Sequence, residues 1–314
     1  MYKSLKILIL VALLLAFTIV SPLWAKEKIG VIYPSLFITE ELASFTQAII
    51  YLEEKGKFDS LVVNGKPTLD SLTSLCRLLK KDRVKNIIIR DDIFNISNFY
   101  PSLSSSQLFF SLSPSLSLPK KKNIKRVVPT YLEMVKVFKN YAEKNNNPDI
   151  YLIMENLTKK DIDSIDKLFN TYKGKWKLFN PKEVLTSFGL NDKLSFENKY
   201  LFLYMTSYKR VGILIQLISK RTKNSHVVIF GNLLSPTFFD LLPNQGPEIL
   251  IETDLDLKSY QKEYEKFRSS MDPKEFLSSI YDFARLKEIY KTILSGKKST
   301  KKAYSIKIQG LRGL

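Results

Sequence analysis

Few residues of this chain have the types and spacing that catalysis requires. The single cysteine, Cys76, lies in LTSLCRLLKK on the apolar face of a predicted helix, and the single histidine, His226, begins a buried strand. One cysteine cannot form an internal disulfide, and this pair argues against a Cys/His nucleophile and against a zinc site. Walker, dinucleotide-binding and nucleophile-elbow patterns are also missing from the sequence. We therefore expect no enzyme activity and no cofactor.

Three charged stretches give weaker signals. RDD (Arg90–Asp92) follows a predicted strand, but adjacent carboxylates point in different directions and make a poor cation site alone. DIDSID (Asp161–Asp166) lies on a predicted helix, where acids at such spacing usually form a solvated face. The basic PKKKNIKR (Pro119–Arg126) either contacts an anionic surface or is a solvated hinge loop, and the loop is favoured.

These stretches are set among apolar runs that alternate with helical patterns along the chain. The predicted strands are Lys28–Pro34, Ser60–Gly65, Val84–Asp92, Gln107–Pro114, Asp149–Asn156, Trp176–Phe179, Tyr200–Met205, Val227–Gly231, Gly246–Leu255 and Tyr304–Ile308. The predicted helices are Thr39–Lys55, Leu69–Lys81, Tyr131–Lys144, Lys159–Tyr172, Val211–Thr222, Leu257–Ser269 and Pro273–Leu294. SLSLPKKKNIKRVVPT, between the two halves, has no apolar periodicity and predicts a linker. Such alternation predicts parallel sheets covered on both faces by helices, and 314 residues favour two lobes.

The N-terminus resembles a secretory signal. Lys3 and Lys6 precede the uncharged run Ile7–Val20, and Ala25 supplies a cleavage point. The alternative is a retained anchor, because Ile7–Ala25 is nearly long enough to span a bilayer. No cysteine follows the apolar run, which argues against a lipoprotein. We expect a periplasmic protein with residues 1–25 removed.

The formal charge of +18 invites a nucleic-acid hypothesis. However, lysine is spread along the whole sequence among Ile, Asn and Tyr, which indicates a compositional bias and not a binding patch. We therefore expect no nucleic-acid partner, and we expect a monomer.

The order of elements resembles the type I periplasmic solute-binding proteins, especially the branched-chain amino-acid-binding branch. The likeness extends from Lys28 to Leu294, and its segments are KIGVIYP, FFSLSPS, RVVPTYLEMVKVFKNYAEK, DIYLIMEN and EYEKFRSSMDPKEFLSSIYDFARLKEIY. The resemblance implies an α/β, two-lobed protein, each lobe a parallel sheet flanked by helices. It implies lobe 1 at residues 26–127 plus 253–294, lobe 2 at 128–252, and a basic tail at 295–314. A small solute such as an amino acid or an amide would bind in the interlobe cleft, and an ABC permease would be the membrane partner.

Ligands of open α/β sheets bind at the carboxyl ends of the strands, which gives the candidate cleft residues by position. They are Asp91, Asp92, Ser113, Ser115, Ser117, Asn156, Tyr208 and Asn232. For an amino-acid ligand, the hydroxyls of Ser113 and Ser115 would hold the carboxylate, and an acid would hold the ammonium group.

Three departures from the family pattern make α-amino-acid recognition doubtful. Leu116 replaces a small residue, Asn232 and Leu233 stand where a second-lobe acid is expected, and SLFITEE after Pro34 lacks glycines. Two alternatives to solute transport therefore stay open. One is a ligand-degenerate interaction or regulatory module of the cell envelope. The other is a sensor domain anchored by an uncleaved N-terminus.

Overall fold

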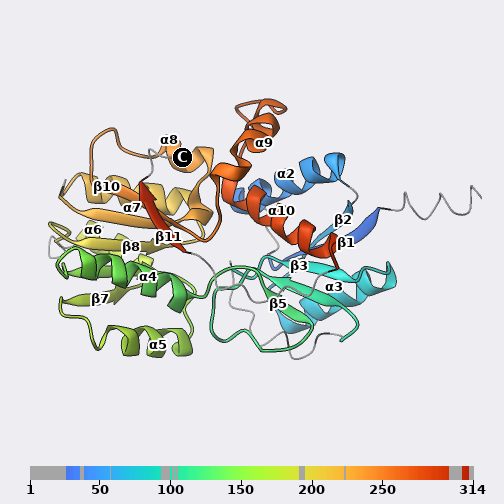
Figure 1. The fold of residues 1–314 in the computed structure, drawn as a ribbon, viewed down its shortest axis with the longest axis horizontal. Helices are drawn as coiled ribbons and strands as arrows, with labels where there is room; N and C mark the ends of the chain where they lie inside the picture. The colour runs from blue at the N-terminus through green and yellow to red at the C-terminus, as the bar shows by residue number, and fades with distance from the viewer. Residues whose placement is uncertain are drawn as a thin grey trace, which may run out of the picture.

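The computed structural model describes residues 26–35, 39–56, 58–92, 100, 103, 105–190, 195–222, 224–296 and 306–310. The predicted signal peptide and most of the predicted tail lie outside these ranges. The described chain forms two α/β lobes that lie side by side, each around its own sheet (Figure 1). No helix in the described ranges is long and apolar enough to cross a membrane.

Lobe 1 is built on a five-stranded parallel sheet in the order β2-β1-β3-β4-β5. Its strands are β1 (Glu27–Tyr33), β2 (Phe58–Asn64), β3 (Asn86–Ile89), β4 (Leu108–Ser111) and β5 (Ile124–Arg126). Its helices are α2 (Glu40–Lys55), α3 (Leu69–Lys81), α9 (Lys258–Ser269) and α10 (Ile280–Leu294). Apolar residues of α2 and α10 pack together on one face of the sheet, and α3 covers the other.

Lobe 2 is built on a six-stranded sheet in the order β11-β10-β9-β8-β6-β7. Its strands are β6 (Ile150–Met154), β7 (Trp176–Phe179), β8 (Tyr200–Tyr204), β9 (His226–Phe230), β10 (Glu248–Thr253) and β11 (Lys307–Gly310). Its helices are α4 (Tyr131–Lys144), α5 (Lys159–Phe169), α6 (Pro181–Leu190), α7 (Tyr208–Ser219) and α8 (Pro236–Asp240). One large apolar cluster joins these elements.

The predicted fold class, two α/β lobes with helix-flanked sheets, is confirmed, with two corrections in detail. The segment predicted as a linker contains β5, a three-residue edge strand whose basic sequence carries no apolar run. The last strand, β11, pairs antiparallel with β10, so the second sheet is not wholly parallel. Helices α6 and α8 were not predicted. The lobe boundaries along the chain stay a prediction.

Polar residues cap the first turns of three helices that begin near strand ends. Thr39 caps α2, accepting from the backbone N–H of Leu42, and Ser207 caps α7. Thr158 caps α5 in a capping box, in which its hydroxyl and the Asp161 carboxylate each accept from the other's backbone N–H. The first turns of α2, α5 and α7 lie at the edge where the lobes meet.

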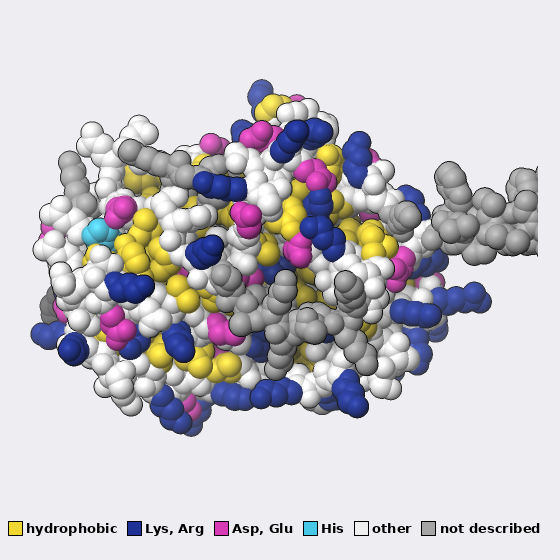
Figure 2. All heavy atoms as spheres, in the orientation of Figure 1, with side chains coloured by type: hydrophobic (Ala, Val, Ile, Leu, Met, Phe, Trp, Pro, Cys, Tyr) yellow, Lys and Arg dark blue, Asp and Glu magenta, His cyan; other side chains and the backbone are white. Residues whose placement is uncertain are grey.

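The positive charge is dispersed over the face of the molecule that Figure 2 shows. On the face shown in Figure 2, Lys and Arg side chains are scattered among acidic, polar and apolar ones and do not form one continuous patch. This distribution agrees with the even spacing of lysine along the sequence.

Candidate functional site

The carboxyl ends of the two sheets face each other across the interlobe boundary. Asn156, which follows β6 in lobe 2, donates from Nδ2 to the carbonyl oxygen of Asp92, which follows β3 in lobe 1, at 3.2 Å. Tyr208 at the start of α7 contacts Ser44 of α2. Ser115, after β4, contacts Asp161 of α5. This boundary is therefore the candidate site, and its residues come from both lobes.

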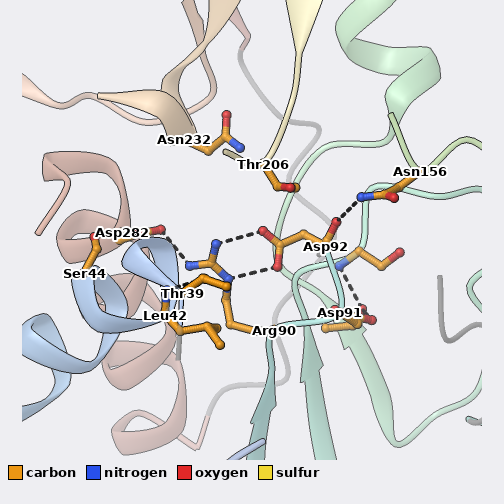
Figure 3. A network of polar contacts seen from close by, with 12 residues as sticks. Thr39, Leu42, Ser44, Arg90, Asp91, Asp92, Asn156, Thr206, Asn232 and Asp282 are labelled. Atoms are coloured by element: carbon orange, nitrogen blue, oxygen red, sulfur yellow. Dashed lines mark hydrogen bonds and ion pairs between the residues drawn. The ribbon is translucent and has the colours of Figure 1, made fainter. Parts of the chain in front are cut away.

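A buried ionic cluster occupies the lobe 1 side of the boundary (Figure 3). The Arg90 guanidinium donates to both carboxylate oxygens of Asp92, at 2.9 and 3.0 Å, and to Oδ1 of Asp282 at 3.3 Å. Its carbon lies 4.8 Å from the centre of the Phe45 ring. Burial raises the pKa of Asp282, although Arg90 lowers it. The Arg90 guanidinium thus pairs with two carboxylates, Asp92 and Asp282, whose side chains are almost fully buried.

Tyr208 connects this cluster to lobe 2. Its hydroxyl donates to Oδ2 of Asp282 at 3.1 Å and lies within hydrogen-bond distance of Oγ of Ser44, at 3.2 Å. Its backbone N–H, the first of α7, donates to Oε1 of Glu41 at 3.2 Å. A carboxylate is favoured there because the first amides of a helix lack partners and carry partial positive charge. Burial raises the pKa of Tyr208 well above its usual range, which keeps the hydroxyl protonated.

The serine loop after β4 is bonded to α5 of the opposite lobe. Ser115 Oγ donates to Oδ2 of Asp161 at 2.7 Å, and the backbone N–H of Leu116 donates to Oδ1 at 2.7 Å. Ser117 Oγ donates to the Thr158 hydroxyl at 2.9 Å. Ser113 contributes within the loop, where its Oγ accepts from the N–H of Ser115 at 3.3 Å.

Two of the predicted residues, Asp91 and Asn232, form their hydrogen bonds within their own lobes and not across the boundary. Asp91 accepts from the hydroxyls of Ser111, at 2.6 Å, and of Tyr100, and burial raises its pKa to about 7. Asn232 donates to the carbonyl oxygen of Met205 at 3.4 Å. Asp91 Oδ1 and Asn232 Oδ1 are buried with no hydrogen-bond partner among the described residues. Of the predicted set, Asp92, Ser115, Ser117, Asn156 and Tyr208 bond across the boundary. Which of them contact a solute stays a prediction.

Sequence reasoning missed the partners of these residues, which are Glu41, Asp161 and Asp282. The prediction that Asp161–Asp166 forms a solvated face is wrong for Asp161, which is 1% exposed, although Asp163 and Asp166 are exposed. The signal that was available is the spacing of Thr158 and Asp161, because a hydroxyl three residues before an acid marks a capping box. The same spacing, between Ser279 and Asp282, was available for Asp282, whereas Glu41 has no hydroxyl three residues before it.

An open depression of about 500 Å³ lies at the mouth of the boundary, where α2 faces α7 and α8, and its lining residues are Thr39, Glu40, Ala43, Lys209, Thr237 and Leu277. Glu40 crosses it, accepting from the Thr237 hydroxyl and lying 3.4 Å from the Lys209 ammonium nitrogen. Within the described ranges, no group of three or more His, Cys, Asp or Glu side chains could hold a metal ion.

Solved structures that share this architecture include solute-binding proteins. A leucine-binding protein, LivK, from Thermotoga maritima has a TM-score of 0.60 at 15% identity, covering 86% of this chain and 82% of its own. A solute-binding protein of an ABC transporter from Rhodopseudomonas palustris, in complex with 3,4-dihydroxybenzoic acid, gives 0.62 at 13% identity, covering 89% and 83%. LivJ from Streptococcus pneumoniae, in complex with isoleucine, gives 0.60 at 14% identity, covering 88% and 85%.

The fold is therefore that of the type I periplasmic binding proteins, as the sequence resemblance predicted. At these identities the likeness concerns the fold alone. No protein-family model matches the chain, and no protein of curated function matches it in sequence.

Proposed function

We propose that this chain is an exported solute-binding protein that holds a small solute between its lobes and delivers it to an ABC permease. The observation that carries the proposal is the meeting of polar groups from two sheets at one buried boundary. Two-lobed proteins of this architecture close around a ligand by a hinge motion. The neighbours that bind isoleucine and 3,4-dihydroxybenzoic acid support a small organic solute. The basic and apolar N-terminal segment supports export to the periplasm.

The donors at the boundary favour a solute that carries a carboxylate or an amide. Ser115 Oγ, the Leu116 N–H and the Tyr208 N–H are hydrogen-bond donors, and each already faces a carboxylate oxygen. Such a donor set suits a carboxylate more than a cation, because bonds from polar N–H and O–H groups to an anion are stronger than those to a neutral acceptor. The role proposed here is binding without chemical conversion.

The test is a binding screen of the exported protein. Branched-chain amino acids, glutamine, 3,4-dihydroxybenzoate and short carboxylates are added in turn, and unfolding is followed by a thermal-shift assay. A solute present at 100 times its dissociation constant stabilises the folded protein by roughly 2.7 kcal/mol, so a ligand gives a clear and saturable shift. Ser115→Phe, which places a ring at the boundary, should block binding of that solute, whereas Ser105→Phe, at an exposed position in lobe 1, should not.

A second function, an interaction or regulatory module of the cell envelope, is favoured by one observation. The walls of the boundary are bonded directly to each other by Tyr208, Asn156 and Asp161. Failure of every solute to shift the unfolding temperature would exclude the solute-binding proposal for the classes screened and leave this second function.

A further inference from the structure

A carboxylate from the chain itself occupies the serine loop after β4. The two oxygens of Asp161 lie 2.7 Å from Ser115 Oγ and 2.7 Å from the Leu116 nitrogen, one oxygen on each donor. This bidentate arrangement of a hydroxyl and a backbone N–H on one carboxylate is how a protein holds a free carboxylate. Here the carboxylate arrives from α5 in the other lobe.

Local structure accounts for only part of the environment of Asp161. As the third residue of α5, it completes a capping box, accepting from the Thr158 N–H at 3.0 Å and from the Thr158 hydroxyl at 2.6 Å. A capping box needs no more than this, as α4 shows. There Glu133 accepts from Thr130 alone among the described residues, and it is exposed to solvent. Asp161 is instead 1% exposed, and it accepts two further bonds from lobe 1.

The surrounding loop is built to present these donors. Ser111 Oγ accepts from the Ser113 N–H at 3.1 Å, Ser113 Oγ from the Ser115 N–H at 3.3 Å, and Ser115 Oγ from the Ser117 N–H at 3.1 Å. Each hydroxyl thus fixes the backbone two residues on, in the manner of Ser/Thr turns. These bonds within lobe 1 support the loop conformation in addition to the bonds that the loop makes to α5.

We infer that Asp161 is an internal competitor, because its carboxylate occupies the Ser115 Oγ and Leu116 N–H donors at the place where the family resemblance implies a solute carboxylate. The chain carries its own ligand analogue, which ties lobe 1 to lobe 2 when no solute is present. The inference rests on the proposed function in one respect, because a solute carboxylate entering this boundary has to displace Asp161.

The experiment removes the occupant and supplies a substitute. Asp161→Ala deletes one carboxylate group and leaves a space of the size of formate. The variant should unfold on the order of 5 °C below the wild-type protein, because a cap and two charge-assisted hydrogen bonds are lost. Sodium formate or acetate should restore part of this difference with a saturable, millimolar dependence, and calorimetric titration should show binding. Sodium chloride at equal ionic strength should not.

Glu133→Ala is the matched control, because it removes a capping-box acid that has no partner in the other lobe. Neither it nor the wild-type protein should respond to formate beyond the chloride baseline. The inference is overturned if Asp161→Ala shows no saturable response to either anion, or if Glu133→Ala responds equally.

The outcome is separable from that of the solute screen. A wild-type protein that binds no solute, together with a formate response in Asp161→Ala, removes the proposed function and keeps the inference about Asp161. A wild-type protein that binds a solute, together with an Asp161→Ala variant that does not respond to formate, keeps the proposed function and overturns the inference about Asp161.

Discussion

Replacing Arg90 by methionine tests whether the ionic cluster holds the boundary together. Methionine keeps an unbranched side chain that can still pack on Phe45, but it leaves Asp92 and Asp282 without their cation at 7% and 4% exposure. Removing one partner of a buried ion pair costs about 3–5 kcal/mol, since an uncompensated charge is left in a poorly solvated site. We therefore expect the free energy of unfolding to fall by about this amount at pH 8.

The pH dependence of the loss identifies its cause. Burial already raises the pKa of Asp282 while Arg90 is present, and removal of the guanidinium raises it further. An acid whose pKa is higher in the folded than in the unfolded state favours folding most below the unfolded pKa, and this advantage is lost as the pH rises through the folded pKa. The deficit of Arg90→Met should therefore shrink when the pH is lowered from 8 to 5.

The assay is urea unfolding at pH 8 and pH 5, with Arg77→Met as the control because Arg77 is exposed on α3. Adding Asp92→Asn and Asp282→Asn to Arg90→Met should recover part of the stability at pH 8. A deficit below about 1 kcal/mol, or one that is equal at both pH values, refutes the argument, because a buried unpaired carboxylate is both costly and titratable.

Three further outcomes are expected. Glu252→Gln should raise the urea midpoint at pH 8 and change it little at pH 4, because burial raises the pKa of Glu252 well above its usual value and both its oxygens lack a hydrogen-bond partner among the described residues. The increase in the urea midpoint caused by Glu252→Gln should thus grow with pH. Tyr208→Phe should lower the free energy of unfolding by about 1–3 kcal/mol in the same assay, since Asp282 loses a buried donor and Ser44 loses a hydrogen-bond partner. Cys76 should not react with a thiol reagent at pH 8 until denaturant is added, because burial raises its pKa to about 12; rapid labelling of the folded protein would contradict this.

Much of the fold could be predicted because its signals are local. The bounds of α3, α4 and β7 agree with the sequence prediction, since an amphipathic stripe or an apolar run fixes them. The strand β5 was missed because it lacks such a local signal. Ile124–Arg126 is held by its pairing with β4, and a short basic edge strand has no pattern of its own.

The candidate site could likewise be predicted only in part. Parallel strands put their carboxyl ends at one edge, so the positions of Asp92, Ser115 and Tyr208 at the boundary followed from topology. Their partners did not. The acceptors Glu41 and Asp161 belong to the first turns of helices in the opposite lobe, and only the docking of the two lobes brings them within hydrogen-bond distance.

These internal bonds set an energetic condition on any solute that enters the boundary. The Ser115 hydroxyl and the Leu116 N–H already have a carboxylate, so a solute carboxylate exchanges one bond for another of the same kind and gains little from the exchange. Net affinity must then come from apolar surface that the solute buries and from differences in how well the lobes close. A change that removes the internal competitor should accordingly strengthen solute binding, which is opposite to the usual effect of deleting a polar residue at a binding site. Asp161→Ala is that change, and the sign of its effect on solute affinity distinguishes an internal competitor from a direct solute contact.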